Sequence, residues 1–172
     1  MAIDQASLDR VRSHIDRVCT QVGRPLGSVR LMAVSKGHPA EAVRQAYALG
    51  LRDFGENYIQ ELNHKADELA ELKDLRWHVI GPMQRNKVKL ALGLATSIQT
   101  VNSIALLERI ESVAQGLERC VPILIQVNVA EEAQKSGCSV QELPELIHHA
   151  AQLKHVHLQG LMLVPPNEPP EV

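Results

Sequence analysis

Residues 29–37 read VRLMAVSKG, an apolar run that ends in a lysine and a glycine. The run Val29–Ser35 is typical of a buried strand in a parallel sheet, because such strands are apolar on both faces. Gly37 and Pro39 then stop the strand and start a helix, which places Lys36 at the carboxyl end of the strand. Ligands bind at that edge in open α/β sheets and in (β/α) barrels. A desolvated lysine amine forms a Schiff base with aldehydes, so Lys36 is a candidate for binding an aldehyde ligand.

The rest of the chain alternates between helix-like and strand-like segments. An amphipathic helix is predicted over residues 4–22, where apolar side chains recur every three or four positions. Further strands are predicted at Arg52–Gly55, Arg76–Ile80, Ser97–Val101, Val121–Val129 and Val156–Val164. Helices are predicted between them at Pro39–Leu49, Asn57–Leu72, Asn86–Leu92, Ser103–Leu117 and Ser139–Leu153. This alternation indicates a parallel sheet with right-handed crossovers.

Two α/β architectures fit six strands in this arrangement. One is a doubly wound open sheet, and the other is a (β/α) TIM-type barrel in which only about six of the eight βα strands are present. We predict the second: a single (β/α) barrel domain over residues 1–172 that is truncated after its sixth strand. In that arrangement the first and sixth strands keep unpaired edges, which tend to recruit other chains.

Composition narrows the class of protein and its partners. The formal net charge is −2 with no basic stripe, which argues against nucleic acid as a partner. Three cysteines without C-x-x-C spacing indicate neither a disulfide framework nor a zinc site. Charged residues near the start and the absence of a long apolar run argue against a signal peptide and a membrane span. We expect a cytoplasmic protein that binds small metabolites.

Other polar side chains occur within or after the predicted strands. Asn57 follows the second strand and is either a helix cap or a ligand-binding residue. Trp77 and His78 alternate in the third strand, so only one of them can point into a barrel interior, and His78 is either a core residue or a ligand-binding residue. Met162 ends the sixth strand and would form an apolar wall. Lys87 is either solvated or close enough to the edge to attract an anion.

Metal and nucleotide sites are not indicated. Two histidines, His155 and His157, share a strand face, but no carboxylate or cysteine stands at ligand spacing beside them. No glycine-rich phosphate loop follows any predicted strand, so the sequence does not support ATP or NAD as a ligand.

Several motifs together resemble a known family. They are AVSK at 33–36, FGENY at 54–58, WHVIGPMQRNK at 77–87, Asn128 with KSG at 135–137, and GLM at 160–162. In this order, over nearly the whole chain, they look like the signatures of the pyridoxal-phosphate homeostasis protein family. The resemblance implies a barrel similar to the alanine racemase N-terminal domain, with pyridoxal 5'-phosphate (PLP) held as a Schiff base on the lysine that matches Lys36. It also implies a non-enzymatic role in binding and delivering the cofactor and in balancing vitamin B6 and amino-acid pools.

On this resemblance we predict four cofactor-binding residues, Lys36, Asn57, His78 and Met162, and PLP-dependent apoenzymes as candidate recipients. The family's serine-rich SMGMS strand end and its RIGxxIFG segment, which resemble contacts to the phosphate and the pyridine nitrogen, do not occur in this sequence. Gly37 stands where the family commonly has threonine. We therefore expect weak retention of the cofactor. Two alternatives stay open. One is a Schiff-base enzyme, either an amino-acid racemase or an aldolase in which His78 serves as acid or base, and the other is a fragment that binds nothing.

Overall fold

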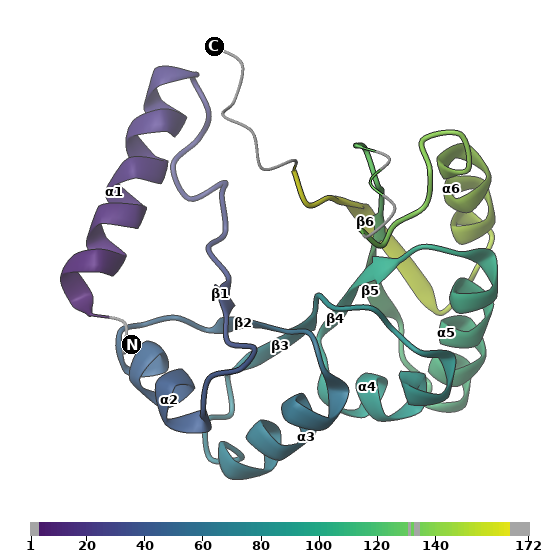
Figure 1. Cartoon of the computed structure of the whole chain (residues 1–172), viewed down its shortest axis with the longest axis horizontal. Helices are drawn as coiled ribbons and strands as arrows, with labels where there is room; N and C mark the ends of the chain where they lie inside the picture. The colour runs from purple at the N-terminus through teal and green to yellow at the C-terminus, as the bar shows by residue number, and fades with distance from the viewer. Residues whose placement is uncertain (1–3, 131, 133–134, 166–172) are drawn as a thin grey trace.

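The computed structural model describes residues 4–130, 132 and 135–165, and these contain one six-stranded parallel sheet. The strands follow each other in chain order, with each one hydrogen-bonded to the next (Figure 1). They are β1 (Ala33–Val34), β2 (Asp53–Glu56), β3 (Arg76–Val79), β4 (Ser97–Val101), β5 (Val121–Gln126) and β6 (Val156–Met162). A doubly wound sheet reverses its strand order at a switch point, and this sheet does not. The architecture is therefore of the (β/α) barrel type, as predicted.

Helices cover the outer side of the curved sheet (Figure 1). The helical segments are α1 (Gln5–Gln21), α2 (Ala40–Ala48), α3 (Ile59–Glu68), the 3-10 turn η1 (Arg85–Lys87), α4 (Val88–Leu94), α5 (Ile104–Gly116) and α6 (Leu143–Ala151). Helices α2 to α6 form the outer layer, while α1 stands apart at the other side of β1. Each outer helix buries an apolar stripe against the sheet, and in α5 this stripe includes Leu107, Ile110 and Ala114.

The two faces of the sheet carry different side chains because successive strand residues point to opposite sides. Phe54 and Trp77 face the helices, where their ring centroids lie 6.0 Å apart within the aliphatic core. Asp53 and His78 are buried on the opposite, inner face, where their side chains contact each other. The prediction that Trp77 and His78 point to opposite faces is confirmed, and His78 is the residue on the inner side.

Strand β1 is shorter than predicted. Only Ala33 and Val34 pair with β2, opposite Phe54 and Gly55, whereas the sequence indicated a strand over Val29–Ser35. In the described part of the chain β1 lies at the edge of the sheet and has a single neighbour. Apolar composition alone cannot hold the preceding residues in an extended ladder, because strand geometry is stabilised by pairing.

Three other predicted boundaries are corrected. Tyr58 occupies the N-cap position of α3, so the interpretation of Asn57 as the helix cap is wrong. Strand β5 ends at Gln126 and not at Val129, because the chain turns after an isolated bridge beyond the strand. Helix α6 begins at Leu143, after a turn in which the backbone N–H and hydroxyl of Ser139 each donate to Glu142 at 2.8 Å.

Candidate functional site

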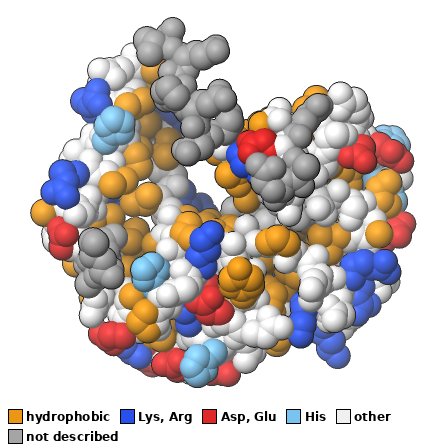
Figure 2. Space-filling model, in the orientation of Figure 1, with side chains coloured by type: hydrophobic (Ala, Val, Ile, Leu, Met, Phe, Trp, Pro, Cys, Tyr) orange, Lys and Arg blue, Asp and Glu red, His pale blue; other side chains and the backbone are white. Residues whose placement is uncertain are grey.

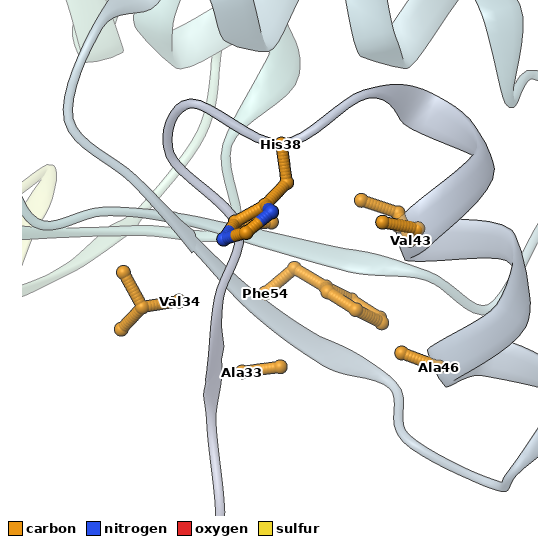
Figure 3. Close-up of a pocket in the computed structure, with 8 residues that line it drawn as sticks. Ala33, Val34, His38, Val43, Ala46 and Phe54 are labelled. Atoms are coloured by element: carbon orange, nitrogen blue, oxygen red, sulfur yellow. The ribbon is translucent and has the colours of Figure 1, made fainter. Parts of the chain in front are cut away.

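Lys36 lies in the turn that directly follows β1, and its side chain is exposed. Figure 3 shows Ala33 and Val34 on opposite sides of β1, with Ala33 toward Phe54. Val34 points to the inner face, and Lys36 follows it two residues later at the carboxyl edge of the sheet. Within the described residues, the Lys36 amine forms no hydrogen bond or ion pair. The Lys36 amine is therefore exposed and unpaired among the described residues.

The backbone beside Lys36 is held by a cluster of charged side chains under the turn. Lys65, from α3, donates to the carbonyl oxygen of Ser35 at 2.6 Å, to Glu56 Oε1 at 2.5 Å and to Glu61 Oε1 at 2.7 Å. The hydroxyl of Ser35 donates to the same Glu56 oxygen at 2.7 Å. The backbone N–H of Gly37 donates to Glu61 Oε1 at 2.7 Å. We refer to Lys65, Glu56 and Glu61 as the ionic cluster.

The ionic cluster contains two carboxyl groups and one ammonium, and two of its three members are buried while Glu61 is half-buried. Lys65 is 3% exposed and Glu56 is 0% exposed, and one oxygen of Glu56, Oε2, has no hydrogen-bond partner. Burial raises the pKa of Glu61, but hydrogen bonds from Lys65 and from the Gly37 N–H outweigh it and hold that pKa below its ordinary value. The cluster therefore keeps carboxylate charge next to the Lys36 turn.

Asn57 follows β2 at the same edge and packs against the loop that follows β3. A Cβ added to Gly81 would lie 2.4 Å from the Asn57 Cα, so only a glycine lets the two loops approach this closely. The backbone N–H of Ile80 donates to Glu56 O at 2.9 Å, and Thr100 Oγ1 donates to Gly81 O at 2.8 Å. The half-buried Asn57 side chain forms no hydrogen bond to other described residues, so its amide is free for a ligand.

His78 lies deeper on the inner face. Its ring contacts Asp53 Oδ1 through Nε2 at 2.9 Å and Ser97 Oγ through Nδ1 at 2.7 Å. Asp53 and Ser97 are the first residues of β2 and β4, so His78 reaches toward the amino ends of the strands and away from the Lys36 edge. Both ring nitrogens are engaged, and this arrangement gives no support to the prediction that His78 contacts a cofactor.

Met162, the last residue of β6, is half-buried and pairs with Gln126. Four strands separate β1 from β6 in the sheet, so pairing does not bring Met162 next to Lys36. Beyond β5, Asn128 organises the following loop by donating to the carbonyl oxygens of Glu132 at 2.9 Å and Lys135 at 3.3 Å. The Lys135 ammonium donates to Glu132 Oε1 at 2.6 Å and to Pro165 O at 3.0 Å.

A cavity of about 130 Å³ lies on the other side of β1, between the sheet and α2. Figure 3 shows His38 from the loop after Lys36, Val43 and Ala46 from α2, and Phe54 from β2 around this space. Its lining is mostly apolar, and it also includes Val34 and Ser35, the two residues that precede Lys36. In the view of Figure 2, hydrophobic side chains gather along the open inner side of the arc, with Lys and Arg side chains among them.

Sequence reasoning missed Lys65 and Glu61. A helix lysine is ordinarily solvated, and that expectation hides the role of Lys65. A signal was present, since Ile59, Leu62, Lys65 and Leu69 recur at helical spacing and place Lys65 on the buried stripe of α3. A charged residue on an apolar stripe needs a buried partner, and the adjacent strand residue Glu56 supplies one.

The described part of the chain contains neither a metal-binding cluster nor a membrane-spanning helix. No group of three or more His, Cys, Asp and Glu side chains that could hold a metal ion occurs in residues 4–130, 132 and 135–165. His155 instead contacts Glu111 through Nδ1 at 2.8 Å. In that described part, none of the helices has the length and apolar character needed to cross a bilayer.

Comparison with known proteins relates the chain to one family. A family model described as alanine racemase, N-terminal domain, matches residues 6–169. The pyridoxal phosphate homeostasis protein of Pseudomonas aeruginosa is 42% identical over 162 residues, which cover 92% of this chain and 69% of that protein. PipY of Synechococcus elongatus, solved with PLP bound, has a TM-score of 0.73 and 38% identity over 88% of this chain and 70% of its own.

Alanine racemase of Clostridium difficile shares the fold, with a TM-score of 0.64 at 15% identity over 91% of this chain and 40% of the racemase. Identity this low supports a common architecture and no shared activity. The level of identity to the homeostasis proteins and the extent of the match are much higher. The chain therefore belongs to the pyridoxal phosphate homeostasis protein family, whose fold is that of the alanine racemase N-terminal domain.

Proposed function

We propose that this chain binds pyridoxal 5'-phosphate as a Schiff base on Lys36 and acts as a non-enzymatic carrier in vitamin B6 and amino-acid homeostasis. The observation that carries the proposal is the exposed Lys36 side chain at the carboxyl edge of the sheet, with no partner for its amine among the described residues. Lys65 and Lys135, by contrast, are held by carboxylates. Names of relatives and the PLP-bound structure of PipY support the same ligand.

The residues at this edge fit the cofactor. Lys36 would hold the cofactor through its neutral amine, and the cofactor would supply an aldehyde for imine formation, with the aldehyde oxygen and the two amine hydrogens released as water. The free amide of Asn57 can donate to or accept from a polar ring substituent. Met162 is proposed as an apolar wall at the far end of the sheet. The close packing of Gly81 on Asn57 keeps the loop backbone at this edge fixed.

The arrangement of His78 does not support the alternative that this chain is a Schiff-base enzyme. A Schiff-base aldolase needs an acid or base next to the Schiff base. His78, the residue considered for that role, is already bonded to Asp53 and Ser97 on the deeper part of the inner face. We therefore favour a carrier, with PLP-dependent apoenzymes as the recipients.

The test is to incubate the chain with pyridoxal phosphate, reduce it with borohydride and map the modified peptide. We expect the adduct on Lys36, its loss in Lys36→Ala, and wild-type labelling in the control Lys89→Ala, which removes an exposed lysine from α4. Predominant labelling of Lys87 or Lys135 would overturn the assignment. Racemisation of alanine by the loaded chain would show that the carrier role is wrong.

A further inference from the structure

The residues immediately before and after Lys36 are both held by side chains of the ionic cluster. Ser35 is bonded twice, through its carbonyl oxygen to Lys65 and through its hydroxyl to Glu56. Gly37 is bonded through its N–H to Glu61 and adopts a left-handed φ of 72°. The three cluster residues therefore converge on one turn, and that turn presents the Lys36 amine.

Lys65 cannot be a second ligand-binding lysine in this arrangement. An ammonium has three N–H donors, and those of Lys65 have three acceptors, in Ser35, Glu56 and Glu61. Only 3% of Lys65 is exposed, so all three donors are already used in a largely buried position. Any influence of Lys65 on a ligand has to act through the groups that it holds.

Simple stabilisation of the fold is a weaker explanation for the cluster. Burying charged groups carries a desolvation penalty that often cancels their attraction, so apolar residues in their place are often as stable. The cluster also leaves Glu56 Oε2 without a partner, which adds to that penalty. Apolar side chains could not form the directed hydrogen bonds that the cluster makes to the backbone on each side of Lys36.

We propose that Lys65 is a positioning residue for Lys36: by tying Ser35 and, through Glu61, Gly37, it fixes the turn from which the Lys36 amine approaches an aldehyde. This inference rests on the proposed Schiff base on Lys36. The Lys36 side chain has no bond of its own in the described structure, so its reach depends on the backbone that carries it. Loss of a fixed starting geometry slows bond formation, and a misplacement of about 1 Å can cost about a hundredfold in rate.

The experiment measures the rate of imine formation in wild type and Lys65→Met by absorbance, with pyridoxal phosphate and with pyridoxal as probes. We expect Lys65→Met to be slower by about tenfold or more with both probes, because the defect lies in the lysine turn. Slowing with pyridoxal phosphate alone would mean that Lys65 acts on the phosphate by its charge, and would overturn the proposal. A wild-type rate with both probes would also overturn it.

Two further variants separate positioning from stability. Leu62→Ala removes a fully buried side chain from the same helix and leaves the three cluster residues unchanged. The double variant Glu56→Gln with Lys65→Met also removes the fully buried carboxylate that the single variant leaves without its ammonium. We expect Leu62→Ala to be destabilised yet to react at the wild-type rate. We expect the double variant to regain stability relative to Lys65→Met yet to stay slow. A double variant that reacts as fast as wild type would show a purely structural role.

A measurement on the protein without cofactor tests the positioning role of Lys65 separately from the proposed function. Hydrogen exchange at the Gly37 amide should accelerate in Lys65→Met and not in the control Lys73→Met, which removes an exposed lysine. Unchanged exchange at Gly37 would overturn the positioning role whether or not a cofactor binds. Borohydride labelling of wild type away from Lys36, together with faster Gly37 exchange in Lys65→Met, would instead refute the proposed function alone.

Discussion

The carboxylate of Asp53 joins His78 across two neighbouring strands, with 2.9 Å between Oδ1 and Nε2. The same carboxylate binds Arg76 through two hydrogen bonds, at 2.8 Å and 2.7 Å. Because the ionised carboxylate can only accept, Nε2 of His78 carries the hydrogen and Nδ1 accepts from the hydroxyl of Ser97. A fully bonded polar group thus occupies the amino-end half of the inner face, and the Lys36 turn occupies the other end.

Because of Asp53, the free energy of unfolding should decrease at acidic pH. Its hydrogen bonds from Arg76, with a smaller contribution from His78, lower its pKa from an ordinary 3.8 to about 2, although burial opposes this shift. A depressed carboxyl pKa contributes stability that is complete above about pH 4 and is lost as the pH falls through about 2. The contribution is at most about 2 kcal/mol, because one pKa unit corresponds to about 1.4 kcal/mol and Arg76 is partly exposed. Urea unfolding should show a difference in unfolding free energy between wild type and Asp53→Asn that becomes smaller from about pH 4 to pH 2. A difference that stays constant over this range would contradict the prediction.

His78 should act on stability and not on the reaction of Lys36. Replacement by Gln breaks buried hydrogen bonds and should cost about 1 to 3 kcal/mol, while borohydride labelling of Lys36 should stay at the wild-type level. Burial lowers the pKa of His78 below its ordinary 6.5, although hydrogen bonding to Asp53 opposes this. The unfolded chain therefore takes up a proton first, and wild-type stability should fall as the pH drops below about 6.5.

The control for that experiment is His64→Gln, which changes an exposed histidine on α3 and should leave stability nearly unchanged. A strong loss of cofactor labelling in His78→Gln at unchanged stability would show instead that His78 contacts the ligand, as the sequence resemblance suggested.

Gly81 should be intolerant of even one added carbon. The Cβ of Gly81→Ala would lie 2.4 Å from both the Asn57 Cα and the Asn57 carbonyl oxygen, so the backbone has to move at a cost of about 1 to 3 kcal/mol or more. Gly93→Ala is the matched control, because Gly93 lies in α4 and its added Cβ would meet no atom within 4 Å. The unfolding free energy of Gly93→Ala should increase by up to about 1 kcal/mol, because alanine has a higher helix propensity than glycine. Thermal unfolding midpoints should move in opposite directions, and a shared direction would contradict the packing argument.

Asn128 should hold the loop after β5. Asn128→Ala removes donation to the Glu132 and Lys135 carbonyl oxygens and acceptance from the Glu132 N–H, so amides from Lys135 to Cys138 should exchange faster. Asn102→Ala is the control, since Asn102 follows β4 and its side chain forms no hydrogen bond to the rest of the described chain. Equal exchange in the two variants would show that the loop is held by other contacts.

Much of the fold was predictable because the signal was local. Strand β4 matches the predicted Ser97–Val101, and the order of helices and strands follows from periodicity alone. The errors occur where pairing or capping decides the outcome. Ala33 and Val34 pair with β2, while the preceding apolar residues do not. Tyr58 occupies the N-cap position of α3, although Asn57 is the better capping residue by type.

The candidate site was predictable only in part. Lys36 was identified because a lysine at the end of a buried strand is unusual, and that placement does not depend on distant residues. The partner of Ser35 comes from a helix thirty positions along the chain, and no local pattern specifies that contact. Strand alternation predicted that one of Trp77 and His78 points to the inner face, but it could not predict the hydrogen bond between His78 and Asp53. Alternation fixes the direction of a side chain and not its partner.

The sequential order of the strands has a consequence for how the protein folds. Each strand of the described sheet finds its neighbour one βα unit away, from β1 through β6, so no pairing waits for a remote part of the chain. Contacts of modest sequence separation lower the entropy cost of loop closure and favour rapid folding. Structure can then extend from any adjacent pair of units toward both edges, and local opening should begin at the edges and reach the buried centre around β3 and β4 last.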